Sequence, residues 1–191
     1  MNMGLIILAT KSVGHKEAML AFLSSQGFKN VMAAESAEDV KKLLAGFDCS
    51  VCLIDMPIAD EIGEDLALFV VNNYSCGVVA VVAAKQEEAF VQALEPSGIF
   101  VISKPINEKL FEKALRFCVA SKQRYMNLEK DKKKLEVKIE ELKIIDRAKL
   151  TLIEKLKMSE EQAHKHIEKQ AMNLRISRRA VAESILKTYE T

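Results

Sequence analysis

The chain has 191 residues, 49% hydrophobic and 29% charged, as in a soluble globular protein with room for one ordinary domain and a smaller one. No apolar run approaches the ~20 residues that cross a bilayer, and the apolar start lacks a basic flank, so we expect a cytoplasmic protein with no membrane partner. Residues 1–120 carry 10 Lys and Arg against 15 Asp and Glu, whereas residues 121–191 carry 18 against 12, so a polyanionic partner is expected to meet the C-terminal part.

Short apolar runs alternate with amphipathic segments over the first 120 residues. The predicted strands are Leu5–Ala9, Val31–Ala34, Val51–Ile54, Val78–Ala83 and Ile99–Ser103. The predicted helices are Lys16–Gln26, a helix capped by Ser36 that ends at Gly46, Asp60–Asn72 and Glu87–Leu94. Because the strands are continuously apolar, they fit a parallel sheet that is covered on both faces. We predict a doubly wound α/β domain with five parallel strands and functional groups at their C-terminal ends.

The cysteines raise the question of a metal or redox site. Cys49 and Cys52 form a C-x-x-C within the apolar run Cys49–Asp55. Residues three apart on a strand point to opposite faces, so these two thiols are not expected to share a metal. We interpret them, with Cys76 and Cys118, as small buried hydrophobic residues, and we predict no metal site.

A long helix is predicted from about Asn107 to Asp146, a stretch without Gly or Pro. Leucines recur in it every seven residues, and Lys132 and Asp146 interrupt the pattern. The apolar positions of this seam are Tyr125, Leu128, Leu135, Ile139 and Leu142. We predict a coiled-coil stalk over residues 123–144 and a homodimer, with a single solvated helix as the alternative.

Beyond the stalk, the tail is expected to break into three shorter helices. The first runs through Leu156, and the second begins at Ser159, which forms a capping box with Gln162. Ser177 caps the third. Apolar positions predicted to face inward are Ala163, Ile167, Ala171, Leu174, Ala180, Val181, Ile185 and Leu186, and Met172 is also interpreted as core. His164 and His166 are two residues apart and do not form a metal pair.

Several residues of the N-terminal part together resemble a response-regulator receiver domain over residues 1–122. These are Asp55 at the end of the third strand, Gly63 eight residues later, and Lys104-Pro105 after the fifth strand. The resemblance implies a flavodoxin-like fold, a phospho-acceptor position at Asp55 and the lysine position at Lys104.

The chain departs from the receiver pattern at two places. Receivers carry an acidic pair after the first strand, which holds the Mg²⁺ that phosphoryl transfer needs, and a Ser or Thr after the fourth. This chain has Thr10 and Lys11 in the first place and Ala83 in the second. We predict a degenerate receiver without a cofactor, in which Lys11 or Lys104 pairs with Asp55 and replaces the metal. The alternative is a response regulator that a sensor kinase switches at Asp55 with Mg²⁺.

Three short motifs make residues 142–188 resemble an ANTAR domain, and we assign residues 145–191 to it. The motifs are Ala148-Lys149, Ser159-x-x-x-Ala163 and Ala171-Met172, with Lys157-Met158 where the family usually has a Gly. ANTAR domains are the RNA-binding modules of amidase-, nitrate- and ethanolamine-type regulators. The resemblance implies a transcription antiterminator whose dimer binds hairpins in nascent leader mRNA and prevents the terminator from forming.

The polar face of the tail is the candidate RNA surface. We predict RNA contacts from Lys149, Lys165, Lys169, Arg175, Arg178 and Arg179. Arg suits both phosphates and base edges. Tyr189 is the only aromatic residue of the tail, so extensive base stacking on rings is not expected.

The sequence leaves two other functions open for the chain. It could be an adaptor whose stalk and bundle dock to a regulatory protein partner, or a helix-turn-helix DNA binder. An enzyme is not expected, because the sequence shows no nucleophile with a base, no phosphate-binding Gly loop and no metal set.

Overall fold

The computed structural model describes residues 4–189 and divides into two compact units, Met1–Asn127 and Leu128–Thr191. We call them the N-terminal unit and the C-terminal unit. The division falls inside one helix, α5 (Glu108–Leu156). No helix among residues 4–189 is both long and apolar enough to cross a membrane.

The N-terminal unit is built on the predicted five-stranded parallel sheet. Its strands are β1 (Leu5–Ala9), β2 (Val31–Ala34), β3 (Cys49–Asp55), β4 (Gly77–Ala83) and β5 (Phe100–Lys104). They are hydrogen-bonded in the order β2-β1-β3-β4-β5, which confirms the predicted fold class. The order changes direction between β1 and β3, so the C-terminal ends of these two strands flank the point where α/β sheets bind ligands.

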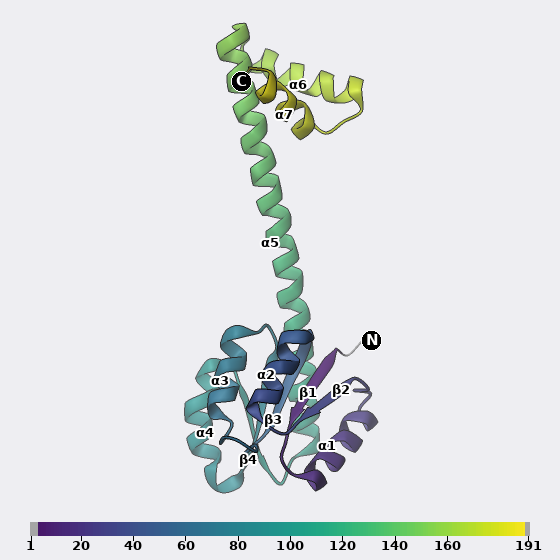
Figure 1. Cartoon of the computed structure of the whole chain (residues 1–191), viewed down its shortest axis with the longest axis vertical. Coiled ribbons are helices and arrows are strands. Elements are labelled where there is room, and N and C mark those ends of the chain that lie inside the picture. Colours follow the sequence, from purple (N-terminus) through teal and green to yellow (C-terminus); the bar gives the residue numbers. More distant parts are fainter. Residues whose placement is uncertain (1–3, 190–191) are drawn as a thin grey trace. The chain divides into compact units, whose positions relative to one another are not determined.

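Helices cover both faces of this sheet (Figure 1). They are α1 (Val13–Ser25), α2 (Ala37–Gly46), α3 (Glu64–Asn73) and α4 (Glu87–Leu94), with short 3-10 turns η1 (Ala84–Gln86) and η2 (Glu95–Ser97) on either side of α4. One core cluster joins α2, α3 and α4 to the sheet, and another joins α1 and the start of α5 to it. The wholly buried strands explain why their sequences are continuously apolar.

Two predicted helix starts were wrong, each for a local reason. Helix α1 begins at Val13 rather than Lys16, because the Ser12 hydroxyl accepts the His15 N–H and caps it. Helix α3 begins at Glu64 rather than Asp60, because Gly63 precedes it in a left-handed conformation with φ 103°. The Asp60 carboxylate instead accepts the Ala37 N–H at 2.8 Å and so helps to begin α2.

The argument that Cys49 and Cys52 point to opposite faces was also wrong. The pairing of β1 with β3 shifts between Leu5 and Ile6, which pair with Cys49 and Val51, so the alternation slips by one residue at Ser50. Cys49 and Cys52 consequently lie in the same core cluster.

The thiols also differ in acidity. A hydrogen bond with Cys76 lowers the pKa of the Cys49 thiol, and burial raises the pKa of the Cys118 thiol to about 12. All four cysteines are free and buried, as the sequence predicted.

Helix α5 is longer than expected and runs without a break through Leu156. The predicted division near Asp146 is wrong because nothing between Asn107 and Leu156 interrupts helical hydrogen bonding. The last turns of α5 therefore supply the first helix of the C-terminal bundle. The predicted boundaries between a stalk over residues 123–144 and a domain over residues 145–191 remain predictions.

The C-terminal unit packs the end of α5 against α6 (Glu160–Leu174) and α7 (Arg178–Tyr189). The predicted capping box at Ser159 and Gln162 is present. Small residues let the helices approach closely, and the buried core consists of Ile145, Ala148, Leu152, Ala163, Ile167, Ala171, Val181, Ala182 and Ile185. The inward placement of Leu174 and Met172 was wrong, since their exposed fractions are 60% and 79%. Both lie beyond the last inward position of α6, Ala171.

Candidate functional sites: the Asp55 pocket and the C-terminal helices

Asp55 is a buried carboxylate at the C-terminal end of β3. Only 3% of the residue is exposed. Thr10, which follows the neighbouring strand β1, is also buried and donates its hydroxyl hydrogen to Asp55 Oδ2 at 2.8 Å. The parallel pairing of β1 with β3 brings these residues together, because both stand at the same edge of the sheet.

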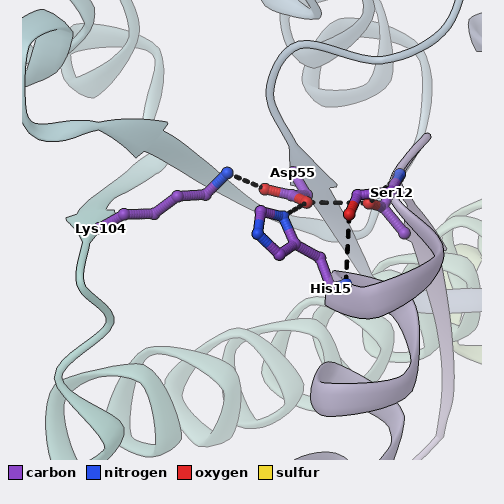
Figure 2. Close-up of polar contacts among 5 residues, drawn as sticks. Ser12, His15, Asp55 and Lys104 are labelled. Atoms are coloured by element: carbon purple, nitrogen blue, oxygen red, sulfur yellow. Dashed lines mark hydrogen bonds and ion pairs between the residues drawn. The ribbon is translucent and has the colours of Figure 1, made fainter.

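Two nitrogen groups approach Asp55 from different elements (Figure 2). Lys104, at the end of β5, places Nζ 2.5 Å from Oδ1. This ion pair is the contact that Oδ1 makes, and Oδ1 has no hydrogen-bond partner among residues 4–189. His15 Nδ1 lies 2.9 Å from Oδ2, and since a carboxylate only accepts, Nδ1 carries the proton in this contact.

His15 is the member of this site that the sequence did not reveal. It stands in the first turn of α1, where the Ser12 cap fixes its backbone. Ser12 in turn donates its N–H to the Thr10 hydroxyl at 3.3 Å, so the Thr10–Ser12 loop positions both contacts to Asp55. The sequence held one signal for it: Ser is a favourable N-cap residue, and a helix that begins directly after Ser12 places His15 in its first turn.

The other two predicted pocket residues make no polar contact with Asp55 within residues 4–189. Lys11 is exposed and makes no ion pair with Asp55, so Lys104 alone of the two candidate lysines reaches it. Ala83 is the exposed last residue of β4 and pairs along the sheet with Lys104. Its methyl group offers no hydrogen bond to Asp55.

The pocket does not fit a magnesium ion. Mg²⁺ prefers several oxygen ligands, chiefly carboxylates and water, in octahedral geometry. Asp55 is instead contacted by an ammonium, an imidazole and a hydroxyl. Residues 4–189 hold no group of three His, Cys, Asp or Glu side chains that could bind a metal.

At the opposite end of the sheet, where β3 begins, a polar contact holds α5 about four turns after its first residue. Lys122 is buried and donates to the Asp48 carboxylate and, at 2.5 Å, to the Cys49 carbonyl. A cavity of about 530 Å³ lies beside it, lined by residues that include Tyr74, Cys76 and Tyr125. The lysine therefore fixes α5 against the beginning of β3.

The predicted seam residues form an apolar stripe that nothing covers within residues 4–189. Tyr125, Leu128, Leu135, Ile139 and Leu142 all lie on α5 with roughly half or more of their surface exposed. Large apolar side chains at such spacing are typical of a helix that pairs with another helix. Val137 is equally exposed but stands outside the spacing.

The six predicted RNA contacts come from all three helices of the C-terminal unit: Lys149 from α5, Lys165 and Lys169 from α6, Arg175 from the C-cap of α6, and Arg178 and Arg179 from α7. Lys149 is largely buried and reaches Asp146 at 2.8 Å and Glu160, in the first turn of α6, at 3.6 Å. Asp146 raises the pKa of Lys149, so its charge is retained at neutral pH. Arg178 lies 3.5 Å from Glu168, in the second half of α6.

The remaining basic side chains are exposed or half-exposed. Lys165 and Arg179 pair with Glu161 and Glu183, one helical turn away. Lys169 and Arg175 make no ion pair with any residue in the range 4–189. The sequence did not identify the exposed apolar side chains that lie among these cations.

Two known protein families match the chain, one in each of its two units. Residues 6–116 match the response regulator receiver domain, and residues 133–186 match the ANTAR domain. A transcriptional regulatory protein of Mycobacterium tuberculosis, PdtaR, is 24% identical over 169 residues, which cover 88% of this chain and 82% of that protein.

Solved structures show the same fold for the N-terminal unit. The receiver domain of an HD domain-containing protein from Pseudomonas fluorescens has a TM-score of 0.60 at 16% identity, and covers 66% of this chain and 94% of its own. The N-terminal receiver domain of a response regulator from Bacteroides fragilis has a TM-score of 0.55 at 20% identity, with 61% and 96% covered.

Proposed function

The chain belongs to the response regulator receiver family and carries a C-terminal ANTAR domain, and from this premise we propose that it is a cytoplasmic, RNA-binding transcription antiterminator. It would bind hairpins in nascent leader mRNA as a homodimer and prevent the terminator from forming. It would act by binding, without enzymatic activity.

The observation that carries this proposal is the charge of one stretch of the ANTAR domain. Residues 169–182 contain Lys169, Arg175, Arg178 and Arg179 but no Asp or Glu. They span the end of α6, the turn and the start of α7. Such an acid-free basic segment attracts a polyanion, and each phosphate contact releases counterions from the nucleic acid.

The exposed seam of α5 supports the homodimer. A leucine repeat on an otherwise charged helix is stable in water when a second helix covers it. Two ANTAR domains on one dimer would then bind two hairpins of the same transcript with an affinity raised by effective concentration.

The contacts of Asp55 support a receiver that is not switched by phosphorylation. Lys104 occupies the lysine position of the family, whereas Thr10 and His15, which follow β1, supply donors to Asp55 where the family has the acidic pair that holds its metal ion. Incubation with Mg²⁺ and acetyl phosphate, followed by mass spectrometry of the intact chain, tests this. We expect no added phosphate; one acid-labile phosphate on Asp55 would favour the alternative, a kinase-switched response regulator.

RNA binding can be tested with paired charge reversals. A gel shift with a tandem stem-loop RNA from the leaders of the protein's own operon is compared with duplex DNA of the same length. We expect Arg178→Glu with Arg179→Glu to weaken RNA binding at least tenfold and to flatten its salt dependence. Lys29→Glu with Lys85→Glu, in the N-terminal unit, is the matched control and should change little.

A verified dimer that binds none of these RNAs would overturn the proposed function. Preference for duplex DNA would favour a DNA-binding regulator instead. A regulatory protein that binds the N-terminal unit is compatible with either result. Such a partner would control the protein's activity and would not be its target.

A further inference from the structure

Three large apolar side chains are exposed within five residues at the turn between α6 and α7. Met172 and Leu174 stand at the end of α6, and Ile176 stands in the turn, with exposed fractions of 79%, 60% and 44%. They lie in the unit whose core is complete without them. Apolar groups gathered in this way on a soluble domain mark an interaction surface.

The backbone of this turn is fixed. The Ile176 N–H bonds to the Ala171 carbonyl at 3.1 Å, and the Arg175 N–H bonds to the Met172 carbonyl at 3.3 Å. These two bonds define a Schellman turn, whose left-handed position is normally occupied by Gly. Here Arg175 occupies it with φ 53°, which strains an L-amino acid. A cation is thus kept at the turn where glycine would be the more stable residue.

The surroundings of the turn favour a nucleic acid over a protein surface. Residues 169–182 carry four cations and no acid, and Lys169 and Arg175 have no ion-pair partner among residues 4–189. A duplex exposes mainly phosphates and sugars, which do not need apolar contacts. Unpaired bases of an RNA loop offer both flat apolar faces and nearby phosphates.

We propose that the α6–α7 turn is the base-binding part of the RNA surface, in which Met172, Leu174 and Ile176 contact unpaired loop bases and Arg175 contacts the adjacent phosphate or base edge. This inference rests on the proposed RNA-binding function and adds to it the mode of recognition. The other cations would then supply affinity without regard to sequence.

The test uses the full-length protein and a stem-loop RNA selected on it from a pool with a random loop. A second RNA keeps the stem but carries abasic nucleotides throughout the loop. We expect Met172→Gln with Leu174→Gln to weaken binding of the intact loop about tenfold, in the lower range for contacts to single bases. Binding of the abasic RNA should not change.

Leu150→Gln is the matched control, because Leu150 is an equally exposed apolar residue of the same unit on α5. It should leave the affinity for both RNAs unchanged. Equal losses with Leu150→Gln, or equal losses for the intact and abasic loops, would overturn the inference.

Arg175→Gly separates a binding role from a structural one. Glycine relieves the left-handed strain, so the variant should unfold at the same temperature as the parent or a higher one. If Arg175 contacts RNA, affinity for the intact loop should nevertheless fall severalfold. A variant that binds as tightly as the parent would contradict its part in the inference.

Three outcomes decide between the proposals. If no RNA is selected by the wild-type dimer, the proposed function fails. If RNA binds and the Met172 and Leu174 variant binds it normally, only the base-binding inference fails. If that variant instead becomes monomeric by light scattering, the turn is a contact between copies of the chain, and the inference is overturned.

Discussion

The two units of this protein use charged side chains in opposite ways. In the N-terminal unit, Lys104, His15 and Thr10 converge from three elements on one buried carboxylate, Asp55. In the C-terminal unit, pairs such as Lys165–Glu161 and Arg179–Glu183 join exposed side chains of one helix. The first arrangement holds a single geometry. The second consists of weak, solvent-exposed pairs, which can be exchanged for phosphates.

The largest expected effect comes from separating the two copies of the C-terminal unit in the proposed homodimer. A single C-terminal unit is expected to bind RNA weakly, because several of its cations are held in exposed ion pairs. Loss of the second unit should therefore lower the RNA affinity more than loss of any single cation. Leu135→Lys with Leu142→Lys should give a monomer by light scattering, and should weaken binding of a tandem stem-loop RNA about 100-fold.

The control for the seam is Val137→Lys, which adds a charge to an equally exposed position outside the repeat. It should preserve the dimer and the affinity. A seam variant that becomes monomeric and still binds the tandem RNA as tightly would show that the two domains act independently.

The next effect compares the loss of a cation that contacts the buried Asp55 with the loss of an exposed cation of the C-terminal unit. Lys104→Met should lower the free energy of unfolding of the N-terminal unit by about 1–3 kcal/mol, because it leaves the buried Asp55 carboxylate without its cation. Lys165→Met removes an exposed cation of the C-terminal unit and should change stability by less than about 0.5 kcal/mol.

Both variants are measured by urea unfolding of the full-length protein, followed by circular dichroism. Equal changes in the two variants would show that Asp55 is solvated in solution and that the contrast between the units does not hold. Asp55→Asn combined with Lys104→Met should recover part of the loss, because the buried charge is then gone.

A smaller effect distinguishes His15 from Lys11 beside the same carboxylate. His15→Gln should cost at most about 1 kcal/mol, since half of the imidazole is exposed and water can replace its contact. Lys11→Gln should cost nothing measurable, because Lys11 does not reach Asp55. A larger loss for Lys11 would mean that the observed pairing is not the one in solution.

The smallest effect concerns Asp60, a carboxylate held by main-chain donors instead of side chains. The hydrogen bond from the Ala37 N–H lowers the pKa of Asp60 below its ordinary value of 3.8. Its contribution to stability is therefore complete above that value and is lost as the pH falls through the lowered pKa. Asp60→Asn should be slightly less stable than the parent at neutral pH.

The difference should disappear at an acid limit below the lowered pKa of Asp60, because both side chains are then neutral. Unfolding midpoints measured between neutral pH and that limit check this. A difference that persists unchanged in acid would show that shape rather than charge at Asp60 begins α2.

Predictions from the sequence held best where a single segment carries the signal. The apolar runs predicted all five strands, and the serines with their spacing predicted the caps of α2, α6 and α7. They failed where two segments meet. The pleat of β3 slips at Ser50 because of its pairing with β1, which no local pattern encodes. Met172 was interpreted as core because its side chain is apolar, although the helix turns that residue away from its neighbours.

The site at Asp55 shows the same limit. Sequence spacing placed Asp55 and Lys104 at strand ends, and parallel topology then made their meeting probable on physical grounds. The sequence spacing gave no reason to expect His15 rather than Lys11 to contact Asp55, since both residues follow β1 closely. The Ser12 cap decides this by fixing the first turn of α1.

The sequence alone determined the order of strands and helices, the long helix with its leucine repeat and the basic charge of the tail, because each follows from periodicity or composition within one segment. Tertiary structure alone decided which groups contact the Asp55 carboxylate and which apolar side chains of the tail remain exposed. Those outcomes depend on how separate segments pack, and packing is a property of pairs of segments that no single stretch of chain contains.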